Sequence, residues 1–183
     1  MARIEPVDPA TSSGRVRELF DEVEARFGAI PNMAKTMAVS PATLEGWLGL
    51  QGALARGRLG GTLGTQIALA TAEANGCLYC LSIHGYVGKA VNNLSDEAIL
   101  ASRRGRSSDA KADAALRFAR AVLETRGSVG DDEVRAVREA GFGDREISEI
   151  VAHVALNVLT NFFNKVAQVE VEFPAAEPLS AAA

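Results

Sequence analysis

The sequence predicts a single all-α domain of about seven or eight helices. Apolar residues recur at helical spacing along almost the whole chain, and the alternation typical of strands is nearly absent. Glycine, proline and capping residues divide this pattern into segments of helix length. The chain has 183 residues, 48% of them hydrophobic, which is enough for one sizeable core. We therefore expect one domain over residues 1–183.

The first third of the chain predicts two helices joined by a less regular stretch. Apolar positions mark one helix over about residues 16–27, which Gly28 would end. A loop with a short helical piece follows over residues 29–39. Ser40 then provides an N-cap, with proline at the first helical position, and the glycine-rich segment 56–61 ends this helix.

The middle of the chain predicts two consecutive helices with a sharp break between them. A helix over about residues 63–74 leads into Asn75-Gly76, a pair typical of helix ends. A new, central helix starts near Cys77 and continues to about residue 91. Both cysteines of the chain therefore lie at its start.

The last part of the chain predicts four helices of different lengths. Ser95 caps a short helix with an acidic first turn, and glycines separate the helices that follow. We expect these over about residues 108–126, 131–140 and 144–168, and we expect residues 1–12 and 174–183 to be poorly ordered tails.

Charge and hydropathy argue against several classes of partner. The formal net charge is -4, the pI is about 5.3, and no basic patch with interleaved aromatics occurs, so we expect no nucleic-acid partner. The N-terminal segment lacks the apolar stretch of a signal peptide, and no run of about 18 apolar residues is found, so we expect no membrane association. The cytoplasm is the expected location.

The stretch EANGCLYCLSIHG contains Cys77, Cys80 and His84. On one helix these positions lie within about 60° of each other, so both sulfurs and the imidazole face the same way. Two cysteines three residues apart can form a disulfide at the first turn of a helix, where free N–H groups favour a thiolate. His84 can accept the proton of Cys80. A nucleophile, a resolving thiol and a base are what thiol peroxidase chemistry needs.

Two alternatives to a redox role remain at this stage. The three residues could be two small buried cysteines and a core histidine, or they could be zinc ligands. A structural zinc site needs four ligands, and three on successive turns of one helix form a poor tetrahedron. In a reducing compartment, closely spaced cysteines are more often redox or metal residues than a structural disulfide. We expect redox chemistry with no metal and no organic cofactor.

Further candidate site residues lie on either side of this cluster and within it. Glu73 is the nearest carboxylate and would share the stripe of the cysteines on an unbroken helix; otherwise it is a solvated or capping residue. Tyr79, between the cysteines, is a candidate pocket residue. A polar stripe on the last helix forms either hydrogen bonds in the core or at a subunit interface, or one wall of a peroxide pocket with its histidine near the thiols. This stripe comprises His153, Asn157, Asn161 and Asn164.

Three segments together resemble the AhpD-like, or carboxymuconolactone decarboxylase, superfamily, and within it the peroxidase-related (alkylhydroperoxidase) branch. They are FGAIPNMAKTMAVSPATLEGW, QIALATAEANGCLYCLSIHGYVGKA and HVALNVLTNFFNKVAQVEVEFP, in the family order over about residues 20–174. The resemblance implies an all-α fold, assembly into homo-oligomers (dimers, trimers or hexamers) and reduction of hydroperoxides through the cysteine pair.

The resemblance also implies a role for each residue of the cluster. Cys80 would be the peroxidatic cysteine, Cys77 the resolving one, and His84 part of a proton relay. Decarboxylase members lack the paired cysteines, which argues against a decarboxylase. The family commonly has a relay glutamate where this chain has Thr65.

We therefore expect a thiol-dependent peroxidase of antioxidant defence that uses an unidentified thiol or dithiol reductant. One alternative is a thiol-disulfide oxidoreductase acting on a protein or lipoyl disulfide. The other is a non-enzymatic oligomeric redox sensor. Thr65 in place of the relay glutamate is compatible with this alternative.

Overall fold

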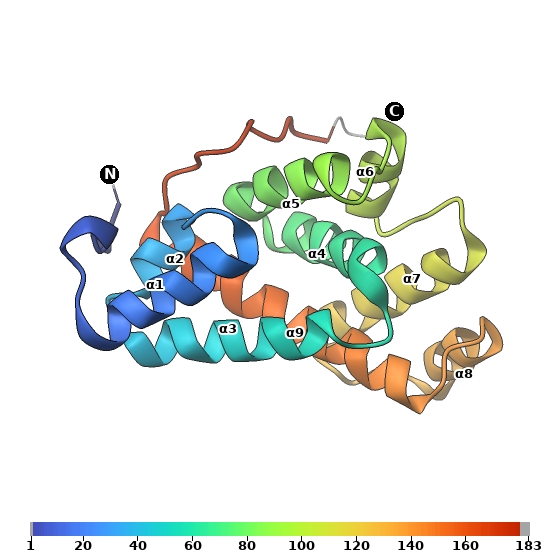
Figure 1. The fold of residues 1–183 in the computed structure, drawn as a ribbon. Coiled ribbons are helices and arrows are strands. Elements are labelled where there is room, and N and C mark those ends of the chain that lie inside the picture. Colours follow the sequence, from blue (N-terminus) through green and yellow to red (C-terminus); the bar gives the residue numbers. More distant parts are fainter. Residues whose placement is uncertain (1, 180–183) are drawn as a thin grey trace.

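The computed structural model describes residues 2–179, and over this range it confirms the all-α fold (Figure 1). These residues form nine α-helices and one 3-10 turn, Pro9–Thr11, and contain no β-strand. The ninth helix, beyond the seven or eight expected, is the short helical piece near residue 35. The helices are α1 (Gly14–Phe27), α2 (Asn32–Met37), α3 (Pro41–Ala55), α4 (Gly60–Asn75), α5 (Leu78–Ala90), α6 (Asp96–Arg103), α7 (Ala110–Glu124), α8 (Asp131–Glu139) and α9 (Asp144–Ala167).

Local caps account for most of the helix boundaries predicted from the sequence. Ser40, Ser95 and Asp109 each accept a hydrogen bond from the backbone N–H three residues later, at the starts of α3, α6 and α7. Gly28 and Gly76 follow α1 and α4 in the left-handed conformation, with φ of 75° and 60°. A glycine adopts this conformation without the steric cost that a Cβ imposes.

The start of α4 differs from the prediction, because its cap comes from a distant helix. The helix begins at Gly60, inside the predicted breaker 56–61. The carboxylate of Glu149, on α9, accepts hydrogen bonds from the backbone N of Arg58 at 2.6 Å and of Leu59 at 3.3 Å. These N–H groups precede the first turn of α4, and a negative charge there also favours the helix dipole.

Helices α4 and α9 form the centre of the molecule. Helix α4 contacts α5, α6, α7 and α9, and α9 also contacts α3, α5 and α7. In Figure 1, α1–α3 lie at one end of the molecule and α8 at the other. By length and composition alone α9 could cross a membrane, a test that buried core helices also pass, and here it packs as a core helix.

The apolar interior has two parts, and both cysteines lie in the first. That part joins α1, α2 and α3 to the start of α5 and the end of α9. The second part joins α4, α7, α8 and the first half of α9. Because Cys77 and Cys80 are only 1% and 2% exposed, their chemistry takes place inside the protein.

Both ends of the described chain are held against the helices, although we expected poorly ordered tails. The backbone N of Arg3 donates to the carbonyl oxygen of Ala167 at 2.8 Å. The C-terminal segment, red in Figure 1, returns along α5, where the backbone N of Ala176 donates to Ser82 Oγ at 3.1 Å. These tertiary bonds hold segments that have little local propensity for order. Residues 1 and 180–183 of the expected tails lie outside the described residues.

Candidate active site

The candidate site begins at the turn that separates α4 from α5. Gly76 reverses the chain, and Cys77 follows with an extended backbone as the N-cap of α5. Its Sγ accepts a hydrogen bond from the backbone N of Cys80 at 3.3 Å, as the side-chain oxygen of a usual N-cap residue does. The first turn of α5 therefore presents both sulfurs to each other.

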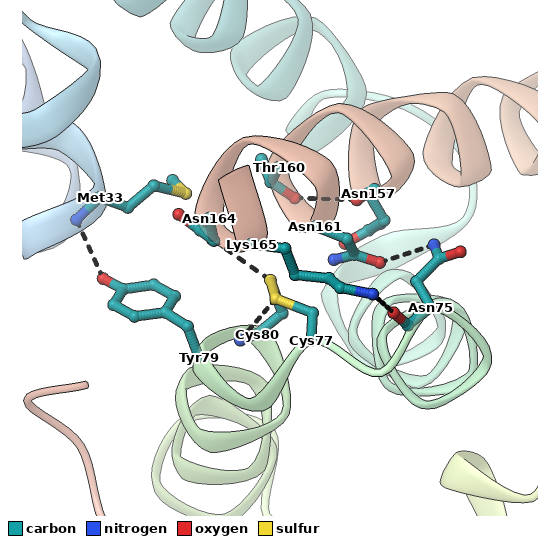
Figure 2. The surroundings of a disulfide bond; sticks show 10 residues. All are labelled: Met33, Asn75, Cys77, Tyr79, Cys80, Asn157, Thr160, Asn161, Asn164 and Lys165. Carbon is teal, nitrogen blue, oxygen red and sulfur yellow. Dashed lines mark hydrogen bonds between the residues drawn. A yellow bond between two sulfur atoms is a disulfide. The ribbon is translucent and has the colours of Figure 1, made fainter. Parts of the chain in front are cut away.

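Cys77 and Cys80 are joined by a disulfide, with their Cα atoms 5.3 Å apart (Figure 2). This separation is usual for disulfide-bonded cysteines. The cysteine pair predicted from the sequence is thus brought together at the start of a helix. A disulfide here can be opened to a dithiol and closed again with little movement of the backbone, because the two residues share one helical turn.

Asn164 is the side chain of α9 that reaches the sulfurs. Its Nδ2 donates to Cys80 Sγ at 3.3 Å, and the side chain is buried. One turn earlier, Asn161 Oδ1 accepts from Nδ2 of Asn75, the last residue of α4, at 2.9 Å. Figure 2 shows both asparagines projecting from α9 toward the turn that carries the cysteines. Asn161 and Asn164, at the C-terminal end of the polar stripe, are therefore the members that face the turn with the cysteines.

Lys165 adds a positive charge beside the same turn. Its Nζ donates to the carbonyl oxygen of Asn75 at 2.6 Å, and a Cβ on Gly76 would lie 3.9 Å from this Nζ. The ammonium thus satisfies a carbonyl at the end of α4 and opposes the negative end of its dipole. The positive charge thus lies beside the turn that leads into Cys77, and a positive charge near a cysteine favours the ionised thiol.

His84 lies one helical turn beyond Cys80 on α5, as expected, and is partly buried. Burial lowers the pKa of this imidazole to about 4. The ring is therefore neutral at pH 7 and can receive a proton only transiently. The imidazole is therefore better suited to passing a proton on than to forming a permanent ion pair with a thiolate.

The lowered pKa of His84 makes stability depend on pH in a defined window. The unfolded chain takes up a proton near pH 6.5, whereas folded His84 does so only near pH 4. Acid therefore favours the unfolded state as the pH falls from 6.5 to 4. Between pH 7 and 5 we expect the wild type to lose up to about 2 kcal/mol more unfolding free energy than His84→Gln. Denaturant unfolding at both pH values measures this, and equal losses would contradict it.

Glu73 does not join the sulfurs, because its carboxylate is bound elsewhere. The break at Gly76 ends the alignment that a continuous helix would give, and Glu73 Oε2 instead lies 2.7 Å from Nε of Arg103, on α6. The arginine side chain is only 6% exposed and that of the glutamate 27%. Among residues 2–179 this carboxylate is the one that pairs with Arg103, which favours a structural role.

The other end of the polar stripe lies away from the cysteines. The ring of His153 packs on Gly64 of α4, where a Cβ would come 3.0 Å from Cε1. Burial lowers the pKa of His153, partly offset by Glu149. Asn157 Nδ2 donates to the carbonyl oxygen of His153 at 2.8 Å. From position 153 to 164 the helix advances about 16 Å, so of the two alternatives for the stripe, the one that places His153 near the thiols is not supported.

Tyr79 points away from the sulfurs and ties three segments together. Its hydroxyl donates to Glu172 Oε1 at 3.0 Å and accepts from the backbone N of Met33 at 3.2 Å. Burial, helped by the Glu172 carboxylate, raises the pKa of Tyr79, so the phenol stays protonated and donates. The hydroxyl thus fixes the start of α5 to α2 and to the C-terminal segment, and Tyr79 does not line a pocket with the cysteines.

Thr65 occupies the expected relay position without acting as a base. Its Oγ1 accepts from Asn92 Nδ2 at 2.8 Å, which links α4 to the end of α5.

Across residues 2–179, no three His, Cys, Asp or Glu side chains gather in a way that could hold a metal ion.

Comparisons with known proteins agree on the type of fold. The model of the carboxymuconolactone decarboxylase family matches residues 41–125, which include the cysteines. No curated protein matches the chain at a significant level. Among solved structures, the AhpD core of an uncharacterized peroxidase-related protein from Ralstonia eutropha JMP134 is 24% identical, with a TM-score of 0.83. This alignment covers 93% of the present chain and 92% of that one.

Two other solved structures are similar over nearly the whole chain. An uncharacterized peroxidase-related protein from Silicibacter sp. TM1040 is 19% identical with a TM-score of 0.77, over 93% of this chain and 94% of that one. The debrominase Bmp8, in complex with 2,3,4-tribromopyrrole, is 19% identical with a TM-score of 0.79, over 94% and 92%. At these identities the likeness establishes the AhpD-like fold.

Proposed function

We propose that this chain, whose residues 41–125 match the carboxymuconolactone decarboxylase family model and whose fold is AhpD-like, is a thiol-dependent peroxidase that reduces hydroperoxides. The observation that carries the proposal is the Cys77–Cys80 disulfide, closed across the first turn of α5 and almost inaccessible. Burial favours an oxidant as small as a hydroperoxide. It disfavours a folded protein disulfide, which could not bring its sulfurs to Cys80.

The proposed cycle uses only the two sulfurs. The Cys80 thiolate attacks the terminal oxygen of the hydroperoxide, the O–O bond breaks, and the alkoxide leaves as an alcohol after taking a proton. Cys77 then attacks the sulfenic acid sulfur, which releases water and forms the disulfide. A low-molecular-weight thiol or dithiol supplies two electrons to restore both thiols. We place this cycle in the cytoplasm, where such reductants are abundant.

Three groups support the ionisation and proton transfer that this cycle needs. Asn164 donates to the Cys80 sulfur, and Lys165 supplies a nearby positive charge. Neutral His84, one turn away, can take the Cys80 proton and pass it to the leaving alkoxide. With these three groups, the proposed cycle does not need a carboxylate at the position of Thr65.

The test compares small oxidants on the same reduced protein. Stopped-flow measurements would follow thiol loss with tert-butyl hydroperoxide, with lipoamide and with 2,3,4-tribromopyrrole. We expect the hydroperoxide to react fastest, at least about 10²-fold faster than with free cysteine at the same pH. A faster reaction with lipoamide would favour the thiol-disulfide oxidoreductase, and one with the bromopyrrole a reductive dehalogenase. A protein no faster than free cysteine with all three would overturn the enzyme and leave the redox sensor.

We also propose that the protein assembles through α9. One face of this helix is apolar and exposed at helical spacing, with Phe162 at 53% and Val166 at 63% exposure. The face comprises Val151, Ala155, Leu159, Phe162 and Val166. A second copy of the same uncharged stripe would cover it, as apolar patches of this kind commonly are in oligomers.

The variant Phe162→Asp tests this assembly. A carboxylate buried within this apolar stripe is expected to convert the oligomer to a monomer, which light scattering coupled to gel filtration would measure. Val39→Asp, an equally exposed apolar position outside the stripe, is the control and should leave the mass unchanged. An unchanged mass for Phe162→Asp would rule out α9 as the interface.

A further inference from the structure

Two buried amide atoms beside the redox pair have no hydrogen-bond partner within residues 2–179. They are Nδ2 of Asn161 and Oδ1 of Asn164, and the two side chains are 0% and 3% exposed. Leaving a buried polar atom unpaired costs free energy, so most such atoms in folded proteins are paired. Within the described residues, these are the buried side-chain nitrogen and oxygen atoms that lack a partner. Asn164 is bonded to Cys80, and Asn161 is bonded to Asn75, two residues before Cys77.

The partners that these amides do have fix which atoms remain free. Asn164 turns its Nδ2 toward Cys80 Sγ, because a disulfide sulfur or a thiolate can only accept. Its Oδ1 is therefore left as a free acceptor. Asn161 turns its Oδ1 toward Asn75 Nδ2, which leaves its own Nδ2 as a free donor. The site thus offers one free acceptor on the amide that is bonded to Cys80 Sγ, and one free donor a helical turn earlier on α9.

We propose that Asn161 and Asn164 form the polar cradle that holds the peroxide group of the substrate against Cys80. The two residues are three apart on α9, where Cβ atoms of neighbours are about 5–6 Å apart. A hydroperoxide has one O–H donor, and each of its two oxygen atoms can accept a hydrogen bond. Its O–H donates to Asn164 Oδ1, which sets the terminal oxygen beside Cys80 Sγ. Its second oxygen accepts from Asn161 Nδ2.

This arrangement gives each amide a distinct role in the proposed reaction, on which the inference rests. As the O–O bond breaks, negative charge develops on the oxygen bound to the alkyl group, and Asn161 Nδ2 is the donor that stabilises it. Asn164 acts twice, because Nδ2 stabilises the Cys80 thiolate while Oδ1 orients the incoming O–H. The cradle also selects for substrates that carry a free O–H on the reacting oxygen, which a dialkyl peroxide lacks.

The test compares two reactions of the same thiol in each variant. Reaction with tert-butyl hydroperoxide uses the cradle, whereas alkylation by iodoacetamide depends on the thiolate but not on a peroxide site. We expect Asn161→Ala to slow the peroxide reaction about 10–100-fold and alkylation less than about threefold. We expect Asn164→Ala to slow both reactions and to move the pH profile of alkylation to higher pH. Asn161→Ser, with a hydroxyl donor, should recover part of the peroxide rate.

One control separates the cradle from packing. Asn157→Ala removes a buried amide that is bonded to its own helix, away from the cysteines. This variant should react with the hydroperoxide within about threefold of the wild type, with circular dichroism confirming the fold. Equal slowing of peroxide reaction and alkylation in Asn161→Ala, or no slowing, would overturn the cradle and leave the peroxidase standing. A wild type no faster than free cysteine would overturn both.

Discussion

Replacement of Cys80 by serine is expected to abolish the reaction with hydroperoxides, whereas Cys77→Ser is expected to react once and stop. Cys80 receives the hydrogen bond from Asn164 and lies one turn before His84. Removing its sulfur removes the nucleophile, and we expect the rate constant to fall by at least about 10³. Without Cys77 the Cys80 sulfenic acid has no intramolecular thiol to condense with, so it accumulates.

Intact-protein mass spectrometry after one equivalent of hydroperoxide distinguishes these states. Cys77→Ser should gain the mass of one oxygen and trap a sulfenic acid reagent, and Cys80→Ser should remain unmodified. The opposite result has a structural rationale too, because Cys77 is the N-cap residue and its sulfur already accepts an N–H. Sulfenic acid on Cys77 in the Cys80→Ser variant would therefore reverse the two roles while keeping the pair.

Glu73→Ala is expected to reduce the unfolding free energy by about 2–3 kcal/mol without changing the pH profile of the thiols. The variant leaves the guanidinium of Arg103, which is 6% exposed, without its carboxylate partner. An unpaired buried charge is destabilising, although the partial exposure of Glu73 tempers the effect. Denaturant unfolding gives the stability, and alkylation across pH gives the thiol profile.

A matched control for this pair is Glu124→Ala, which breaks an exposed ion pair with Arg120. Exposed pairs of this kind contribute about 0.3–0.5 kcal/mol. If Glu73→Ala were no more destabilising than the control, the ion pair with Arg103 would contribute little to the unfolding free energy. A shifted alkylation profile in Glu73→Ala would instead place this carboxylate in the proton relay.

The sequence was sufficient to predict the parts of this fold that local interactions decide. Ser40, Ser95 and Asp109 bond to N–H groups within their own first turn, and Gly76 follows its helix in a conformation that suits glycine. The spacing of Cys77 and Cys80 is likewise a property of one helical turn. Such features depend on neighbours in the chain, so a single sequence displays them.

The features that the sequence could not predict depend on partners far away in the chain. Glu149 caps the start of α4 although it lies about 90 residues later in the chain, and the ion pair with Arg103 keeps Glu73 away from the sulfurs. Asn164 is 84 residues from Cys80. The spacing of the stripe did reveal polar side chains on an apolar helix, but not which end of it meets the cysteines. Only the packing of α9 against α5 decides that.

The measurement that tests the central claim most directly is a titration of the fully reduced protein with tert-butyl hydroperoxide, read out by peptide mapping. The account predicts that one equivalent of peroxide consumes both thiols and yields the Cys77–Cys80 disulfide, with one equivalent of alcohol. It also predicts that added dithiol restores the starting protein. Thiols that persist after several equivalents, or that are oxidised without forming this disulfide, would contradict the account.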